Sequence, residues 1–179
     1  ADAMVAGLKE VYPYRSIIIH DDPTQGIAVF SKYPLAEVNA LDWFGTANIS
    51  GKVLVNDEAI NFLGLHTRSP LTKQRWEVRN DHIELARNLV SETEGEFIVL
   101  GDFNTVPWDS RMKRFKSATQ LADSRRKLTP TYPTWNPFVG QIPIDYIFHS
   151  KGIACQSLDS VNITSDHKGI LGKYNLKGT

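Results

Sequence analysis

The chain has a single cysteine, Cys155, among its 179 residues. It therefore contains neither an internal disulfide nor a zinc site built from several thiolates. No run of about 18 apolar residues is present, so no helix is expected to cross a membrane. Lysine plus arginine number 20, as do aspartate plus glutamate, so the formal net charge is zero. A neutral chain argues mildly against a nucleic-acid partner, whose many phosphates need a broad basic surface.

The composition is that of one globular domain. Hydrophobic residues make up 41% of the chain and charged residues 22%, close to the averages of globular domains. The length suits one domain, and no repeat, linker or low-complexity tract divides it. We expect a single domain over residues 1–179.

Segments rich in β-branched and aromatic residues alternate with polar turns and helical patterns, which predicts an α/β or α+β fold. The predicted strands are Tyr14–His20, Gly26–Ser31, Val38–Phe44, Asn48–Val55, Ala59–His66, Glu96–Gly101, Ile144–Ser150, Ile153–Val161 and Gly169–Leu176. The clearest predicted helix covers Thr72–Glu92, with Trp76 and Ile83 on its apolar face and Arg79 pointing elsewhere. A shorter helix is predicted from about Asp109 to Lys116.

The segment FIVLGDFN delivers a carboxylate and a carboxamide to the end of a buried strand. The apolar run Phe97–Leu100 is followed at once by Gly101 and Asp102, with Asn104 two residues further on. This spacing points both side chains to one side of an extended strand. Ligands of open α/β sheets bind outside such strand ends. The structural alternative is an Asx-turn that closes the loop before Pro107.

Other ionisable residues also lie at or near strand ends. His66 ends the apolar run of INFLGLHT, and Asp145 lies inside the apolar segment QIPIDYIF. Asp166 and His167 precede a strand in NITSDHKGIL. Each has a plainer interpretation, as a surface histidine, an edge-strand carboxylate or a turn former. A bare carboxylate at Asp145 would be costly to bury, so it needs a partner, for which His167 is the obvious candidate.

If these strand ends converge, they form one polar cluster of carboxylates, an amide and two imidazoles. Its members would be His66, Asp102, Asn104, Asp145, Asp166 and His167. Oxygen-rich ligands without thiolates suit Mg²⁺ or Mn²⁺, which also retain waters and bind phosphate oxygens. Such a cluster fits metal-assisted attack of water on a phosphate ester.

A basic cluster follows the GDFN segment. It comprises Arg111, Lys113, Arg114, Lys116, Arg125, Arg126 and Lys127. These side chains are suited to attract phosphates or an anionic lipid surface. They are equally well explained as a solvated helix face and loop.

The order of the motifs resembles that of the endonuclease/exonuclease/phosphatase superfamily. The resemblance rests on GIAVFSKYPL, NFLGLHT, FIVLGDFN, PTYPTW before PIDYIF, and SDH, and it runs from about Leu8 to Leu176. It implies a four-layer sandwich of two mixed β-sheets flanked by helices. It also implies a divalent-metal-dependent phosphoesterase. The segments around GIAVFSKYPL and HTRSPLTKQRWEVRN further resemble a bacterial subgroup whose catalytic domain often follows N-terminal membrane helices.

The resemblance implies roles for individual residues. Asp102 and Asn104 match the pair that orients the attacking water and holds the scissile phosphate. His66 matches a phosphate ligand or general acid. Trp108, beside the GDFN loop, either stacks on substrate or shields the site, whereas Trp135 is expected to pack in the interior.

The SDH motif and the PIDYIF aspartate complete the implied site. His167 matches a residue that contacts the phosphate as general base or electrophilic stabiliser. Asp145 would accept the other N–H of this imidazole and so fix its tautomer. Asp166 would be a metal ligand, with help from Asp102. Whether Asp102 or His167 takes the proton from water is left open.

The chain departs from the family pattern at its start. Family members begin with one strand that ends in an Asn and a second that ends in a metal-binding Glu, and neither is found here. We therefore expect an N-terminally incomplete domain that binds its ion weakly and has little or no activity. An exposed sheet edge would favour self-association, and a membrane anchor would belong to the missing part. His82, where the family helix often has Gln, is expected on the helix surface.

The sequence thus predicts a phosphodiesterase, nuclease or phosphatase that uses Mg²⁺ or Mn²⁺. The substrate is a phosphate ester, and nucleic acid, lipid and small-molecule esters all remain open. The alternative is a non-catalytic binding or scaffold module that keeps the fold.

Overall fold

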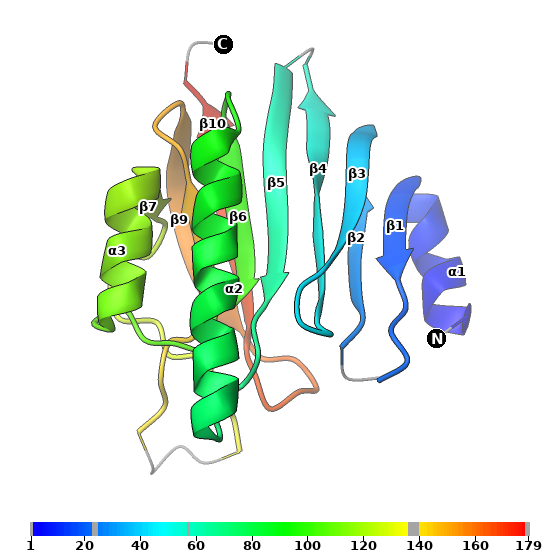
Figure 1. Cartoon of the computed structure of the whole chain (residues 1–179). Coiled ribbons are helices and arrows are strands. Elements are labelled where there is room, and N and C mark those ends of the chain that lie inside the picture. Colours follow the sequence, from blue (N-terminus) through cyan, green and yellow to red (C-terminus); the bar gives the residue numbers. More distant parts are fainter. Residues whose placement is uncertain (1, 23–24, 57, 136–139, 178–179) are drawn as a thin grey trace.

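The computed structural model describes residues 2–22, 25–56, 58–135 and 140–177 (Figure 1). The elements follow in the order α1 (Asp2–Val11), β1 (Tyr14–Ile18), β2 (Ile27–Ser31), β3 (Leu35–Asp42), β4 (Ala47–Val55), β5 (Glu58–His66), α2 (Lys73–Glu92), β6 (Phe97–Asp102), α3 (Ser110–Thr119), β7 (Ala122–Asp123), β8 (Asp145–His149), β9 (Ile153–Val161) and β10 (Gly169–Leu176). The described helices include none that is both long and apolar enough to cross a membrane.

A six-stranded mixed sheet organises the molecule, with strand order β3-β4-β5-β6-β8-β7. β5 and β6 run parallel, joined by the crossover helix α2, and the other neighbours are antiparallel. A parallel pair requires such a crossover because its strands must start from the same end. The predicted α/β class, with a large mixed sheet flanked by helices, is confirmed.

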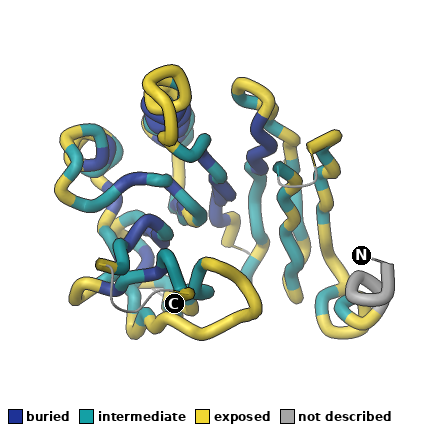
Figure 2. The backbone as a smooth tube through the Cα atoms, turned by 90° about the horizontal axis from the view of Figure 1, so that it is seen from below, coloured by how far each residue is buried: buried dark blue, intermediate teal, exposed yellow. Residues whose placement is uncertain are grey.

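The core lies between this sheet and the two helices that cover one of its faces (Figure 1). Leu63 and Val99 on the sheet are fully buried, as is Ala86 on α2. Beneath α3, the rings of Phe103, Phe115, Tyr146 and Phe148 pack with centroid separations of 5.1–5.6 Å. Seen from below, buried positions lie under the helices, while the loops at this end are largely exposed (Figure 2). Apolar burial on the helix-covered face therefore fixes the sheet.

Two hairpins lie against the opposite face. β1 pairs with β2 and β9 pairs with β10, each as a separate two-stranded sheet. Between the sheet and β10 is a hollow of about 510 Å³, lined in part by Ile60, Ile98 and Leu176. The sequence predicts an exposed groove of this kind. Self-association through it stays a prediction.

Strand positions match the sequence prediction closely, because alternating and continuous apolar runs are strong local signals. The helix predicted at Thr72–Glu92 begins one residue later, with Thr72 as its N-cap accepting the N–H of Arg75 at 3.2 Å. Asp109 likewise caps α3, which extends to Thr119. The helix α1 and the two-residue strand β7 were not predicted.

The face assigned to α2 was wrong at two positions. Trp76, placed on the apolar face, is 44% exposed, whereas Arg79, placed elsewhere, is only 3% exposed. The helical period of the apolar residues predicts that a long cationic side chain outside their face points to solvent. Here its guanidinium instead donates from Nη1 to the Asn104 carbonyl at 3.1 Å and lies 3.7 Å from the Asp109 carboxylate. These partners offset part of the cost of burying the cation, and burial lowers the pKa of Arg79.

One glycine governs how closely the two parallel strands approach each other. Gly101 has a φ of 137°, and a Cβ atom there would lie 1.9 Å from the carbonyl oxygen of Leu65. Neither the dihedral angle nor the space suits any other residue. The strand end that carries Asp102 therefore depends on Gly101.

Replacing Gly101 by alanine is expected to lower the free energy of unfolding by about 2 kcal/mol or more, since it combines backbone strain with a backbone clash. Urea denaturation measures the change. The matched control is Gly140→Ala, because a Cβ there meets nothing within 4 Å. Equal stability of the two variants would contradict the assignment.

Candidate active site

Strand register brings three of the predicted residues into one row. His66 pairs with Asp102 across the parallel strands β5 and β6. Asp102 in turn pairs with Asp145 across the antiparallel strands β6 and β8. Residues opposite each other on neighbouring strands have adjacent side chains. The last residues of β5 and β6 and the first residue of β8 therefore place polar side chains at one end of the sheet.

Asp102 organises the loop that follows it. Its Oδ1 accepts the backbone N–H of Asn104 at 2.7 Å, and its Oδ2 accepts the side-chain amide N–H of the same residue at 2.9 Å. Asn104, at φ 46°, also donates from Nδ2 to the Thr67 carbonyl. The Asx-turn that was the structural alternative does form. It fixes the same carboxylate and carboxamide that the functional interpretation requires.

Asp145 and His167 form a hydrogen-bonded pair. His167 Nδ1 donates to Asp145 Oδ2 at 2.9 Å, because an ionised carboxylate can only accept. His167 Nε2 then lies 4.0 Å from Asp102 Oδ2. The ring of Tyr132 packs against the imidazole at a tilt of 41°, with a centroid separation of 4.7 Å. The contact between Asp145 and His167, predicted from the cost of burying a bare carboxylate, is confirmed.

Burial and neighbouring charges shift the pKa values of several groups in this site. Burial, together with the nearby Asp145 carboxylate, raises the pKa of Asp102 to about 7. The hydrogen bond to Asp145 raises the pKa of His167. Burial lowers the pKa of His66, and the nearby His167 lowers it further. Shifts of both signs within one cluster are typical of functional sites.

A cleft of about 370 Å³ opens beside these groups. Its lining includes His66, Asp102, Asn104, Tyr132, Asp166 and His167. Asp145 is not in this lining but is hydrogen-bonded to His167. The structure therefore brings together all six residues of the predicted polar cluster. Trp108 is not in this lining and is 57% exposed.

Metal-ligating atoms gather at the same place. Within the described residues, Asp102, Asp145 and His167 each offer a ligand atom, and these atoms lie within 4.8 Å of one another. The predicted ligand Asp166 lines the cleft but is not in this group. Carboxylate oxygens and an imidazole suit a hard divalent cation.

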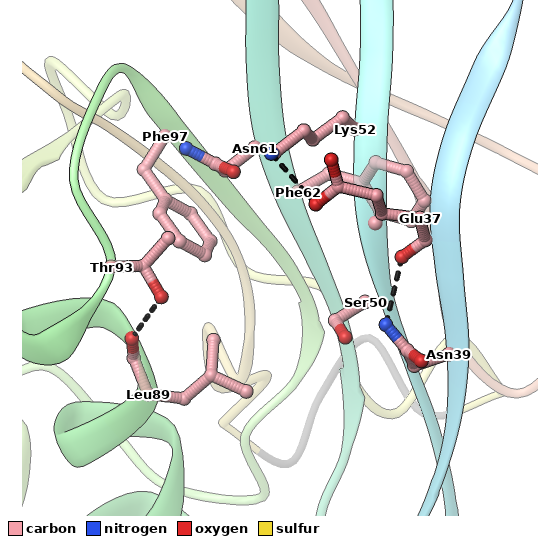
Figure 3. Close-up of a pocket in the computed structure, with 10 residues that line it drawn as sticks. Glu37, Asn39, Ser50, Lys52, Asn61, Phe62, Leu89, Thr93 and Phe97 are labelled. Carbon is pink, nitrogen blue, oxygen red and sulfur yellow. Dashed lines mark hydrogen bonds and ion pairs between the residues drawn. The ribbon is translucent and has the colours of Figure 1, made fainter.

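A second hollow lies at the far end of the sheet, where β5 and β6 begin (Figure 3). It measures about 220 Å³ and contains the ion pair between Lys52 and Glu37, 2.7 Å apart. Asn61 and Phe97 form part of its wall. None of the residues predicted for the site lies here.

Two sequence predictions near the site were wrong. His82 is fully buried rather than on the helix surface. Its Nδ1 accepts the N–H of Arg68 at 3.2 Å, so Nε2 carries the proton and donates to the Trp43 carbonyl at 2.6 Å. Trp135 is 70% exposed rather than packed. A neutral imidazole between a donor and an acceptor uses both of its nitrogens in hydrogen bonds and can therefore be buried. The residue type alone does not reveal such partners.

Sequence reasoning also missed two residues that support the site. Tyr132, which packs against His167, carries no charge and stood out only as part of the PTYPTW segment. Arg79 holds the carbonyl of Asn104. Its signal, one of three arginines on the helix that precedes the GDFN strand, is too common to be diagnostic.

Comparison with known proteins identifies the family of this chain. The model of the endonuclease/exonuclease/phosphatase family matches residues 2–167. The chain belongs to this family. Members of the endonuclease/exonuclease/phosphatase family hydrolyse phosphate esters with the aid of divalent metals. A comparison with curated protein sequences finds no significant match.

Solved structures share the fold at low sequence identity. An endonuclease/exonuclease/phosphatase from Beutenbergia cavernae is 16% identical with a TM-score of 0.80, and the match covers 98% of this chain and 57% of that one. A humanised TDP2 from D. rerio is 17% identical with a TM-score of 0.73, covering 97% and 81%. The 3′ phosphatase NExo from Neisseria, bound to product DNA hairpin, is 16% identical with a TM-score of 0.72, covering 95% and 82%. The chain thus spans little more than half of the Beutenbergia protein.

The buried, neutral His82 predicts a pH-dependent stability. Burial lowers its pKa from 6.5, so the unfolded chain takes up a proton at a pH where the folded protein does not. Its contribution is therefore present above pH 6.5 and is lost as the pH falls below that value. Urea denaturation of the wild type and His82→Gln measures it. The stability advantage of the wild type should shrink on acidification, and a constant difference would contradict the assignment.

Proposed function

We propose that this cleft hydrolyses a phosphate ester by direct attack of water, assisted by a divalent cation. One observation carries the proposal: the Asp145–His167 pair points its free imidazole nitrogen toward Asp102 in a cleft that also contains Asn104 and His66. Membership of the endonuclease/exonuclease/phosphatase family supports the reaction class. The DNA bound to the Neisseria 3′ phosphatase supports a phosphate ester as substrate.

The Asp145 carboxylate determines which nitrogen of the His167 imidazole carries the proton. Asp145 accepts from Nδ1 and thereby leaves Nε2 facing the cleft. There it contacts the phosphate or accepts a proton from the attacking water. Asp145 fixes the tautomer and stabilises the imidazolium, as the supporting carboxylate of hydrolytic triads does.

Asp102, Asn104 and His66 complete the machinery. The attacking water forms a bond to phosphorus, the ester P–O bond breaks, and the proton of the water goes to Asp102 or His167. Asn104 donates both amide N–H groups, to Asp102 and to the Thr67 carbonyl, so its role is to position Asp102 and to accept a hydrogen bond from the attacking water at Oδ1. Burial keeps His66 neutral, so its N–H donates to a phosphate oxygen.

The donor set fits Mg²⁺ or Mn²⁺. Asp102 and Asp166 line one cleft, and a cation between them would relieve the repulsion that helps to raise the pKa of Asp102. A bound cation supplies positive charge that activates water and neutralises the phosphate. Two carboxylates are few, so we expect weak binding and slow turnover by this chain.

His167→Ala is expected to lower the hydrolysis rate of bis-para-nitrophenyl phosphate by about 100-fold or more, the usual contribution of a positioned acid or base. The control is His20→Ala, which removes an imidazole from the β1–β2 turn. Circular dichroism checks that both variants fold. An unchanged rate for His167→Ala would rule out the assigned role.

Removal of metal should abolish turnover. Chelation by EDTA is expected to stop hydrolysis, and added Mn²⁺ or Mg²⁺ should restore it. Asp166→Asn should raise the cation concentration for half-maximal rate by about 10-fold or more, because it removes a ligand charge. Glu58→Gln, at the opposite end of β5, is the control. Metal binding without hydrolysis of any phosphate ester would favour the non-catalytic module instead.

A further inference from the structure

The imidazole of His66 makes no hydrogen bond of its own within the residues that the structure describes, although it lines the cleft. Two other side chains of the site are fixed directly. The ring of His167 donates to Asp145, and Asn104 is held by its own amide. The place of the His66 imidazole therefore depends on how the backbone of this residue is held.

Backbone hydrogen bonds hold the segment that begins at His66. Thr67 bonds to the strand end that carries Asp102. Its N–H donates to the Asp102 carbonyl at 2.9 Å, and its carbonyl accepts from Asn104 Nδ2 at 2.9 Å. The N–H groups of the residues on either side of Thr67 have other acceptors, and both acceptors are side chains.

Two fully buried side chains accept these two N–H groups. Asn48, in β4, accepts the His66 N–H through Oδ1 at 2.9 Å. His82, in α2, accepts the Arg68 N–H through Nδ1 at 3.2 Å. The backbone pairing of β4 with β5 ends two residues before His66, so the Asn48 side chain supplies an acceptor where the backbone ladder has stopped.

A single turn anchors both side chains. Trp43 and Thr46 close the turn between β3 and β4 through two mutual backbone hydrogen bonds of 3.1 Å. The two residues between them have φ values of 54° and 70°, as a type I′ hairpin turn requires. The Thr46 carbonyl accepts Nδ2 of Asn48 at 3.0 Å, and the Trp43 carbonyl accepts Nε2 of His82 at 2.6 Å. Each of these two carbonyls therefore holds one of the two side chains.

We call Asn48 and His82 together the turn clamp. We propose that the turn clamp positions the His66 imidazole for contact with the phosphate, by tying the backbone of His66 and Arg68 to the β3–β4 turn. Neither member of the turn clamp lines the cleft, so both act through His66 as positioning residues. A misplacement of about 1 Å can lower a catalytic rate by about 100-fold. The effect on turnover rests on the proposed hydrolytic function, whereas the place of the imidazole does not.

Asn61 shows what a purely structural amide does on the same strand. It lies near the other end of β5, is also buried, and donates from Nδ2 to the carbonyls of Glu94 and Glu96 at 3.0 and 3.2 Å. Figure 3 shows Asn61 at the hollow that contains none of the predicted site residues. A satisfied buried amide of this kind stabilises the fold wherever it lies. Loss of the turn clamp differs from loss of Asn61 because it also displaces His66.

The first test compares Asn48→Leu with Asn61→Leu, each of which replaces a buried amide by a side chain of similar volume. Asn48→Leu is expected to lower kcat/KM for bis-para-nitrophenyl phosphate by about 10-fold or more, because the imidazole is no longer held in place. Asn61→Leu should keep the kcat/KM of the wild type. Circular dichroism and urea denaturation verify that both variants are folded in the assay.

A double-mutant cycle separates positioning from stability. In the His66→Ala background, Asn48→Leu should change kcat/KM by less than about twofold, because the group that it positions is absent. His82→Leu should behave as Asn48→Leu does. His82→Gln should retain most of the activity, since its amide offers both an acceptor and a donor. The two His82 variants carry the test if Asn48→Leu does not fold.

Nuclear magnetic resonance follows the imidazole without turnover. In proton–nitrogen correlation spectra of the histidine rings, Asn48→Leu should move the His66 signals toward those of an unrestrained imidazole, and Asn61→Leu should leave them in place. Unchanged His66 signals in Asn48→Leu would overturn the proposal, as would an equal loss of kcat/KM with and without His66. A wild type that hydrolyses no phosphate ester would remove the proposed function, and the His66 signals would still decide the role of the turn clamp.

Discussion

The parallel pairing of β5 with β6 is the constraint on which the site depends. Gly101 lets the two backbones approach so closely that a side chain has no room beside Leu65. The resulting register sets His66 next to Asp102, and the antiparallel partner β8 adds Asp145 to the row. A shift of one residue would turn these side chains to the other face of the sheet. The chemistry of the cleft thus follows from backbone geometry.

The same geometry brings carboxylates close enough to repel one another, and hydrogen bonds from neighbouring residues offset part of this repulsion. Two carboxylates and two imidazoles line one cleft, with the Asp145 carboxylate bonded to one of these imidazoles, and burial together with Asp145 raises the pKa of Asp102. Asn104 donates two hydrogen bonds to Asp102, and His167 donates one to Asp145. A bound divalent cation would offset the negative charge of the carboxylates and of an anionic phosphate. The site is therefore suited to bind these two ligands jointly.

The local elements could be predicted from sequence, and the reason is visible in particular segments. Phe97–Leu100 is a continuous apolar run typical of a buried strand, and it does form β6, although Leu100 is 39% exposed. Asp145 could be paired with His167 because a lone buried carboxylate is costly. The sequence did not reveal that Arg79 is buried, since its partner Asn104 lies 25 residues away in the chain. Long-range hydrogen bonds leave no periodic signal.

The central claim is that a divalent cation and a phosphate meet between the ends of β5, β6 and β8. The most direct measurement is anomalous diffraction from crystals grown with Mn²⁺ and inorganic phosphate. The account predicts an anomalous peak inside the cleft, in contact with the Asp102 carboxylate and with a phosphate beside Asn104. A cleft without a peak at saturating Mn²⁺, or a peak confined to an unrelated surface, would contradict it.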